Sequence, residues 1–262
     1  MNQIAEFLRS QFELGISYHQ LGCYRAALSA ILPKVEGGTI AHHEVIVRVM
    51  QAAYRHNPPK VRYNSTWNVE PVIQAWNKAN EPLSLCDLTV KTFTLVSFAT
   101  MGRTADLRSL GSTGYSIART TTGDLEHLAL NRLRLPKQQK SGPLLPVIIK
   151  ALGPDMADMC PVRACLAYMS RTANLRDNDT LELFISTRKP HKAIAPKTAS
   201  RWLLRSMGMG DIDLTTFKAH STCGAAASSK VKAGATISEI MSAGRWYSQS
   251  TLRKSYLREL PN

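Results

Sequence analysis

Residues 87–100 are the stretch that most constrains the fold, because they follow helical spacing and are strongly apolar. The apolar residues are Leu88, Phe93, Leu95, Val96 and Phe98. A helix of this kind must be buried inside a domain. The sequence therefore predicts a buried helix, which presents Arg103 just beyond its end.

Three short amphipathic patterns open the chain. The first helix is expected over 2–13 and the third over 42–56, since apolar residues recur there at helical spacing. The second helix lies between them, where Ser17 can cap its start and Pro33 ends it. The residues that follow combine two prolines with two basic residues and no helical period, which suits a linker or an ordinary loop. We expect a helical domain over 1–57, a linker over 58–68 and a larger domain over 69–262.

The larger domain is predicted to contain both helices and strands. Further helices are expected over 69–79, 160–173 and 198–207. Strands are expected over 115–119, 127–135 and 180–187. A turn over 136–142 separates the second strand from the apolar stretch 144–149. The expected fold class is mostly α with a small antiparallel β-sheet, divided between a helical domain and a mixed α/β domain.

The C-terminal stretch gathers reactive side chains among small residues. Alanines favour a helix over 215–230, which would place His220 and Cys223 three residues apart on one face. A further helical run is expected over 250–260, with Tyr256 among basic residues. A phenol in so cationic a setting is unusual.

A short helix is expected between these two runs. Thr236 and Glu239 have the spacing of a capping box, in which each side chain satisfies a backbone N–H at the helix start. Gly244 stands where a helix is expected to stop.

Positive charge is in large excess. The 33 Lys and Arg residues outnumber the 19 Asp and Glu, so the net charge is +14 and the pI about 9.8. Because this charge is spread along the chain, it favours a polyanionic partner such as DNA. Ribosomal, heparin-binding and membrane-surface proteins carry similar charge, so charge alone leaves those classes open.

The cysteines and the hydropathy of the chain indicate the cellular compartment in which the protein is expected. Five cysteines without a Cys-x-x-Cys pair indicate reduced thiols in an intracellular protein, with neither a disulfide framework nor a metal site. No apolar run approaches ~18 residues, and the first residues lack the layout of a secretion signal. We expect no membrane span and no bound metal.

Two ordered motifs resemble those of the tyrosine recombinases, the phage-integrase-like family. Residues 99–110 carry an Arg followed three residues later by an acid, here Arg103 and Asp106. The second motif is His220-x-x-Cys223, Gly234, Gly244-Arg245-Trp246 and then Tyr256. The resemblance implies a helical core-binding domain before the family's mixed α/β catalytic domain. It also implies cleavage and religation of double-stranded DNA through a 3′-phosphotyrosine intermediate.

The resemblance assigns a role to each matched residue. Tyr256 is expected to attack the scissile phosphate, and Arg103 to grip its nonbridging oxygens with a bidentate fork. His220 and Trp246 would hydrogen-bond or position these oxygens, and Asp106 would orient Arg103 or His220. No metal or cofactor is needed. Taken singly, each residue also suits an ordinary core or surface position.

A lysine of the turn over 136–142 is expected to protonate the departing 5′-oxygen, as a β-hairpin lysine does in this family. Lys140, which is followed by Ser-Gly, is the first choice. Lys137, nearer the end of the strand, is the alternative.

Cys223 departs from the family pattern, because it occupies the position of the second catalytic Arg. A neutral thiol cannot supply a forked cation. Loss of one preorganised transition-state donor typically costs ~10²–10³ in rate. We therefore hypothesise that this chain binds DNA like a recombinase but cleaves it poorly or not at all.

Within this family, segments 15–29 and 58–67 resemble the recombinases of DIRS-type retrotransposons. Trp246, which stands where many family members have a His, agrees with that branch. This branch implies transposon integration or DNA strand exchange by a dimer or tetramer on DNA. It also implies a nuclear location, or a cytoplasmic one for any other origin. The alternatives are a non-catalytic DNA-binding protein derived from such a recombinase, which Cys223 favours, and a related monomeric topoisomerase.

Overall fold

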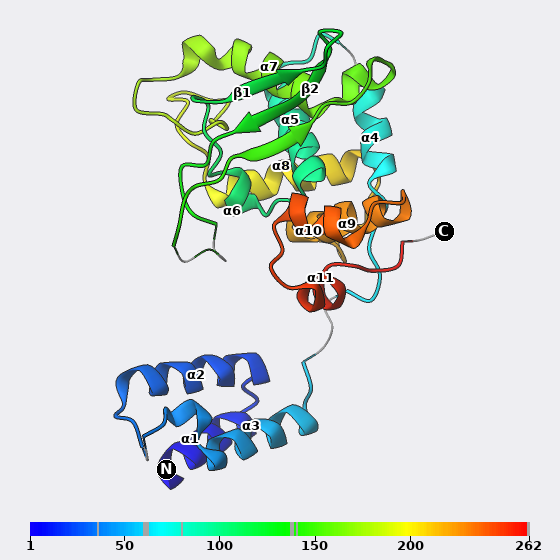
Figure 1. The fold of residues 1–262 in the computed structure, drawn as a ribbon. Helices are drawn as coiled ribbons and strands as arrows, with labels where there is room; N and C mark the ends of the chain where they lie inside the picture. The colour runs from blue at the N-terminus through cyan, green and yellow to red at the C-terminus, as the bar shows by residue number, and fades with distance from the viewer. Residues whose placement is uncertain (36, 60–62, 80, 137–138, 140, 261–262) are drawn as a thin grey trace. The chain divides into compact units, whose positions relative to one another are not determined.

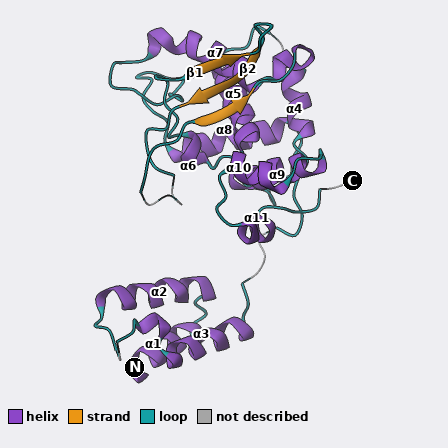
Figure 2. Ribbon diagram, viewed as in Figure 1, coloured by secondary structure: helices purple, strands orange, loops and turns teal. Residues whose placement is uncertain are grey.

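The computed structural model describes residues 1–35, 37–59, 63–79, 81–136, 139 and 141–260. The chain forms two compact units, Met1–Tyr63 and Asn64–Asn262 (Figure 1). Helices account for most of the regular structure, and the strands belong to one small sheet (Figure 2). The predicted fold class, mostly α with a small antiparallel sheet, is confirmed.

The first unit is a small helical bundle. It contains α1 (Asn2–Glu13), α2 (Tyr18–Ile31), a 3-10 turn η1 (Ile40–His42) and α3 (Glu44–His56). Ser17 caps α2 as predicted, because its hydroxyl accepts the N–H of Gln20. The buried core consists of Leu8, Leu21, Ile40, Ile46, Met50 and Ala53. The three predicted helices are thus confirmed.

The second unit is built around α5 (Leu85–Thr100), and the burial of this helix is as the apolar stretch predicts. This helix is buried on nearly every side. The helices that contact it most extensively are α7 (Pro161–Thr172), α8 (Pro196–Met209) and α9 (Thr222–Lys232), and α4 (Glu70–Asn77) packs on α8. Met101 then adopts a left-handed conformation, which turns the chain into the short helix α6 (Thr104–Leu107).

The sheet covers another side of α5. Its strands β1 (Ser116–Arg119), β2 (Leu125–Leu130) and β3 (Val147–Lys150) are antiparallel in the order β1-β2-β3. The side chains of Leu128, Leu130, Val147 and Ile149 are buried, and β3 contacts both α5 and α7. The connection to α7 contains η2 (Pro154–Met159), and η3 (Ala173–Leu175) follows α7.

The expected strand over 180–187 is wrong. This segment makes only isolated bridges, from Glu182 to Gly111 and from Ile185 to Ala193. Because its residues pair with two different neighbours in turn, no continuous ladder forms.

The expected single helix over 215–230 is also wrong. Lys218 has an extended backbone, with φ of −111° and ψ of 166°, and this interrupts the helical conformation after the turn at 214–216. A 3-10 turn, η4 (Ala219–Ser221), follows, and α9 begins only at Thr222.

Two further helices end the chain, α10 (Ile237–Gly244) and α11 (Gln249–Ser255), which group with α9 (Figure 1). The capping box is confirmed: the Thr236 hydroxyl accepts the N–H of Glu239, and the Glu239 carboxylate accepts the N–H of Thr236. Helix α11 ends earlier than the predicted run, at Ser255.

The end of the segment expected to be a linker packs into the second unit. Trp67 is buried, and its indole N–H donates to the Ser221 hydroxyl at 2.9 Å. The N–H of Thr66 donates to the carbonyl of Glu259 at 3.1 Å. No described helix is both long and apolar enough to cross a membrane. Among the described residues, no cluster of His, Cys, Asp and Glu side chains is arranged to hold a metal ion.

Candidate active site

Tyr256 contacts a residue that lies 153 positions earlier in the sequence. It follows α11 directly, at the C-terminal cap. Its hydroxyl oxygen accepts a hydrogen bond from Nη2 of Arg103 at 2.8 Å, and the guanidinium carbon lies 5.5 Å from the centre of the phenol ring. The structure therefore brings together the two residues expected to attack and to grip a phosphate.

Arg103 is positioned by the turn after α5. The left-handed Met101 reverses the chain, and Arg103 becomes the N-cap residue of α6. Asp106 lies in α6, and its carboxylate is 3.9 Å from Nη1 of Arg103. A carboxylate three residues away on a helix can hold a guanidinium in one orientation. Asp106 thus occupies the place expected of a positioning residue.

Trp246 packs against Tyr256 from the loop after α10. Its side chain is 5% exposed, and the two ring centres are 5.0 Å apart. Its indole N–H is buried and has no hydrogen-bond partner among the described residues. A buried donor without a partner is rare in proteins and suits a site that receives an acceptor from a ligand.

Helix α10 ends at Gly244, where a helix stop was expected, although Gly244 itself is not left-handed. The left-handed residue is Arg245, with φ of 53°. Gly244 instead leaves room for Trp246, because a Cβ atom at Gly244 would lie 1.9 Å from Cζ3 of the indole. The glycine is needed for the position of the indole beside Tyr256.

The small residues of α9 let the backbone of Tyr256 come close. A Cβ atom at Gly224 would lie 2.9 Å from the carbonyl oxygen of Tyr256. One turn later, the hydroxyl of Ser228 accepts the N–H of Arg258 at 3.0 Å. Helix α9 therefore acts as the support on which the residues after α11 are held.

Gly224→Ala is expected to displace Tyr256, because the new methyl group meets backbone atoms that cannot rotate away. Overpacking of this kind typically costs ~1–3 kcal/mol. We expect a lower melting temperature and a weaker Arg103–Tyr256 contact, measurable by thermal denaturation and by the phenol proton shifts in NMR spectra.

Gly22→Ala is the matched control for this change. Gly22 is also helical, and a Cβ atom there would meet no neighbouring group of the described chain within 4 Å. Gly22 is half-buried, and replacing a helical glycine by alanine where there is room for the methyl group should raise the stability of the protein by ~0.5–1 kcal/mol. Equal stability of the two variants would contradict the role given to Gly224.

Cys223 lies in the first turn of α9, beside Arg103. Its side chain is 4% exposed, and its Sγ is 3.2 Å from the carbonyl oxygen of Gly102. Burial raises the pKa of the thiol to about 12, although the charge of Arg103 opposes this shift. The thiol is therefore neutral near pH 7 and provides no positive charge to the site.

The other residues predicted for the site are His220 and a lysine of the turn over 136–142. His220 lies in η4 and is exposed, whereas Cys223 lies in α9 and is buried. Its role toward a phosphate stays a prediction. Lys137 and Lys140 lie outside the described residues, and the choice between them stays open.

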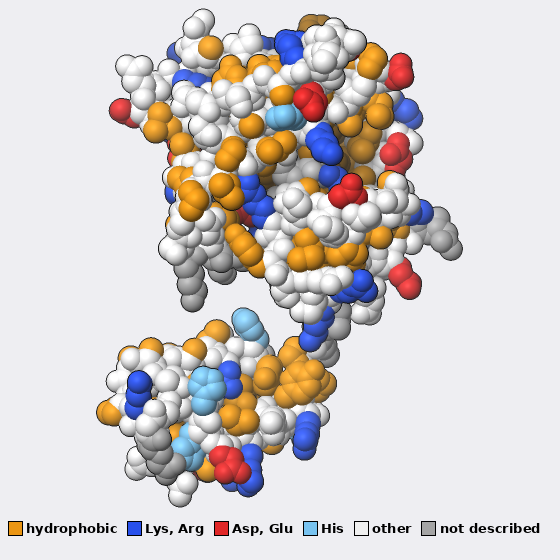
Figure 3. All heavy atoms as spheres, viewed as in Figure 1, with side chains coloured by type: hydrophobic (Ala, Val, Ile, Leu, Met, Phe, Trp, Pro, Cys, Tyr) orange, Lys and Arg blue, Asp and Glu red, His pale blue; other side chains and the backbone are white. Residues whose placement is uncertain are grey.

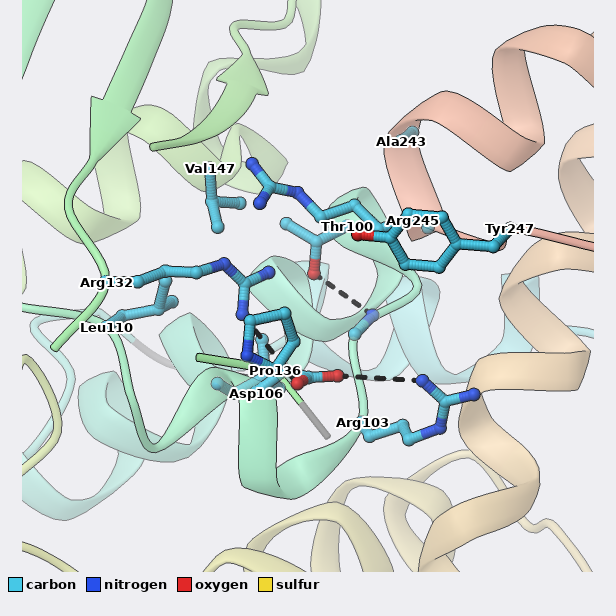
Figure 4. A pocket seen from close by; sticks show the side chains of 13 residues that line it. Thr100, Arg103, Asp106, Leu110, Arg132, Pro136, Val147, Ala243, Arg245 and Tyr247 are labelled. Atoms are coloured by element: carbon cyan, nitrogen blue, oxygen red, sulfur yellow. Dashed lines mark hydrogen bonds and ion pairs between the residues drawn. The ribbon is translucent and has the colours of Figure 1, made fainter. Parts of the chain in front are cut away.

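Sequence reasoning missed a pocket beside Arg103. Arg132, Arg245 and Tyr247 line it together with Arg103 and Asp106 (Figure 4). In the space-filling view, Lys and Arg side chains border a recess between the sheet and α10 (Figure 3). The Gly-Arg-Trp motif pointed to Arg245 but gave it no role. Arg132 has no sequence signal, since one arginine after a strand is an ordinary feature.

Comparison with known proteins identifies the fold of the chain but assigns no activity to it. No protein-family model and no curated protein sequence matches the chain. Among solved structures, the XerH site-specific recombinase bound to palindromic difH substrate has a TM-score of 0.63 at 13% identity, over 96% of this chain and 67% of that one. The lambda integrase (75–356) dimer bound to a COC′ core site has a TM-score of 0.54 at 16% identity, over 100% and 82%.

XerA recombinase gives a TM-score of 0.51 at 15% identity, over 95% of this chain and 83% of that one. Identities this low establish the architecture alone. The chain therefore has the fold of the tyrosine recombinases.

Proposed function

We propose that this protein is a DNA-binding tyrosine recombinase in which Tyr256 attacks a backbone phosphate and forms a 3′-phosphotyrosine intermediate. The observation that carries the proposal is the 2.8 Å hydrogen bond between Arg103 and the Tyr256 hydroxyl, made within a fold of this class. The net charge of +14 supports a polyanionic substrate.

The proposed chemistry follows from the groups at the site. The phenol oxygen forms a bond to phosphorus and loses its proton, and the 5′-oxygen leaves and gains one. The guanidinium of Arg103 would stabilise the negative charge on the nonbridging oxygens. The Trp246 N–H, which is buried and has no partner among the described residues, would donate to one of them. Because the phosphotyrosine keeps the energy of the broken bond, a 5′-hydroxyl can reverse the step.

The experiment that tests this proposal uses a duplex nicked near the cleavage point, so that the released strand diffuses away and the protein stays attached. We expect a protein–DNA adduct that resists denaturation and that mass spectrometry maps to the peptide containing Tyr256. An adduct on another residue, or none even after long incubation with several duplexes, would refute a catalytic role.

A non-catalytic DNA-binding protein is the second candidate, and the buried thiol of Cys223 favours it. This thiol is neutral and cannot replace a second guanidinium beside the phosphate. Tight DNA binding without any cleavage is the outcome expected from this candidate.

Duplex binding is expected to weaken steeply with salt. A protein that makes six to ten phosphate contacts loses ~10³–10⁵ in affinity between 50 and 200 mM salt, because bound counterions are released. Fluorescence anisotropy of a labelled duplex over this salt range measures the slope. An affinity that stays constant across the range would argue against DNA as the partner.

The narrower assignment rests on the sequence resemblance. We propose an origin in a DIRS-type retrotransposon, assembly as a dimer or tetramer on DNA, and a location in the nucleus. Light scattering of the protein with and without duplex tests the assembly. A particle that stays monomeric on DNA while it relaxes supercoils would favour a topoisomerase instead.

A further inference from the structure

Arg132 is a buried arginine with unused hydrogen-bond donors. It follows β2, its residue is 8% exposed, and its Nε and Nη1 atoms have no hydrogen-bond partner among the described residues. Its one described ion pair is with Asp106, at 3.7 Å between Nη1 and Oδ1. Burial lowers the pKa of this guanidinium, and the charge of Arg245 lowers it further. A buried cation this poorly paired is costly unless a ligand completes its environment.

The pocket around Arg132 holds more positive than negative charge. Figure 4 shows the side chains of Arg132 and Arg245 entering it from different elements, with Asp106 between Arg103 and Arg132. Arg245 donates to the carbonyls of Leu145 and Pro146, and these neutral acceptors leave its charge unbalanced. Among the described lining residues, three guanidinium groups therefore share a single carboxylate, and the excess charge favours an anion.

One carboxylate connects this pocket to Tyr256. The two oxygens of Asp106 lie 3.9 Å from Arg103 and 3.7 Å from Arg132. Arg103 in turn donates to the hydroxyl of Tyr256. An anion bound by Arg132 would therefore be connected to the phenol through Asp106 and Arg103.

We propose that Arg132 binds a phosphate group of the DNA backbone in this pocket, through the donors that have no partner among the described residues. The class of ligand follows from the donors, since arginine suits the tetrahedral oxygens of a phosphate. The identity of that phosphate as part of DNA rests on the proposed function. Arg132 thereby supplies positive charge, in addition to that of Arg103, near a site to which the neutral thiol of Cys223 contributes none.

The first test uses inorganic phosphate as the probe and needs no DNA. Phosphate should raise the melting temperature of the protein by ~4 °C at ten times its dissociation constant, relative to chloride at equal ionic strength. Arg132→Met should abolish this rise. Met has a similar length and no charge, so the variant should melt at or above the temperature of the unchanged protein without phosphate.

Arg134→Met is the matched control. Arg134 lies two residues further along the same segment, is exposed and pairs with Glu182 at 3.4 Å. This variant should keep the full response to phosphate. If Arg132→Met does not fold, Arg132→Lys takes its place, and its single amine should reduce the response by at least half. An equal response in the unchanged protein and in the Arg132 variant would overturn the proposal.

The second test separates this inference from the proposed function. With a duplex, the slope of log affinity against log salt should become less steep by about one in Arg132→Met. The change should be smaller in Arg134→Met. Phosphate binding without any duplex binding would refute the proposed function and leave the pocket established. Steep duplex binding that is identical in the unchanged protein and in both variants would refute the role of Arg132 and leave the function standing.

Discussion

Tyr256→Phe is expected to abolish the protein–DNA adduct on a nicked duplex. The substitution removes the one oxygen that can bond to phosphorus and keeps the ring that packs at 5.0 Å from Trp246. The fold and the affinity for duplex should change little, because the hydroxyl makes one described hydrogen bond, to Arg103. Removing a nucleophile that acts as part of a catalytic unit can cost ~10⁶ in rate, so the adduct should fall below detection.

Tyr247→Phe is the matched control, because Tyr247 lines the neighbouring pocket and is largely exposed. Both variants lose one phenolic oxygen near Arg103, and only the change at Tyr256 removes the proposed nucleophile. Both proteins are incubated with the same labelled duplex, denatured and separated by electrophoresis. Adducts that persist in Tyr256→Phe and vanish in Tyr247→Phe would move the nucleophile to Tyr247.

Local signals explain which parts of the fold the sequence could predict. The central helix α5 follows from apolar spacing, and the start of α10 from the pairing of Thr236 with Glu239. Each signal lies within a few residues, so the chain carries it whatever the tertiary surroundings. The closeness of Arg103 and Tyr256 has no local signal. It could be expected only because the ordered motifs resemble a known family.

Tertiary contacts explain what the sequence could not predict. The segment 180–187 looks like a strand, but its hydrogen bonds alternate between two neighbours. The stretch 215–221 was expected to be helical, yet the backbone of Lys218 is extended, and its carbonyl accepts the N–H of Ser221 in a 3-10 turn. Arg132 becomes noticeable only once burial leaves its donors without described partners. In each case, the deciding atoms are side-chain or backbone groups whose partners periodicity does not specify.

Cys223→Arg is expected to raise the rate of adduct formation by ~10²–10³. The residue lies beside Arg103, at the first turn of α9, so a guanidinium there would add a preorganised donor to the phosphate. The cost is steric, because Cys223 is buried against the carbonyl of Gly102. We expect a loss of ~1–3 kcal/mol in the free energy of unfolding, to be measured by denaturant titration. The adduct assay is therefore run well below the melting temperature.

Cys223→Met controls for size, because it adds volume at the same place without charge. It should reproduce part of the loss in stability and none of the gain in rate. A gain in both variants would show that relief or distortion of packing, and not the guanidinium, changes the activity. A high adduct yield in the unchanged protein, with no gain from the arginine, would contradict the interpretation of Cys223 as the missing phosphate contact.

Combining Cys223→Arg with Arg132→Met tests whether the two positions serve the same phosphate. If Arg132 already stabilises the charge that the lost arginine would carry, the gain from Cys223→Arg should be larger when Arg132 is absent. Residues that share one ligand group are coupled in this way, whereas independent sites have effects that multiply. Equal gains in both backgrounds would place the phosphate of Arg132 elsewhere on the DNA, because a contact to a different phosphate leaves the transition state at Tyr256 unchanged.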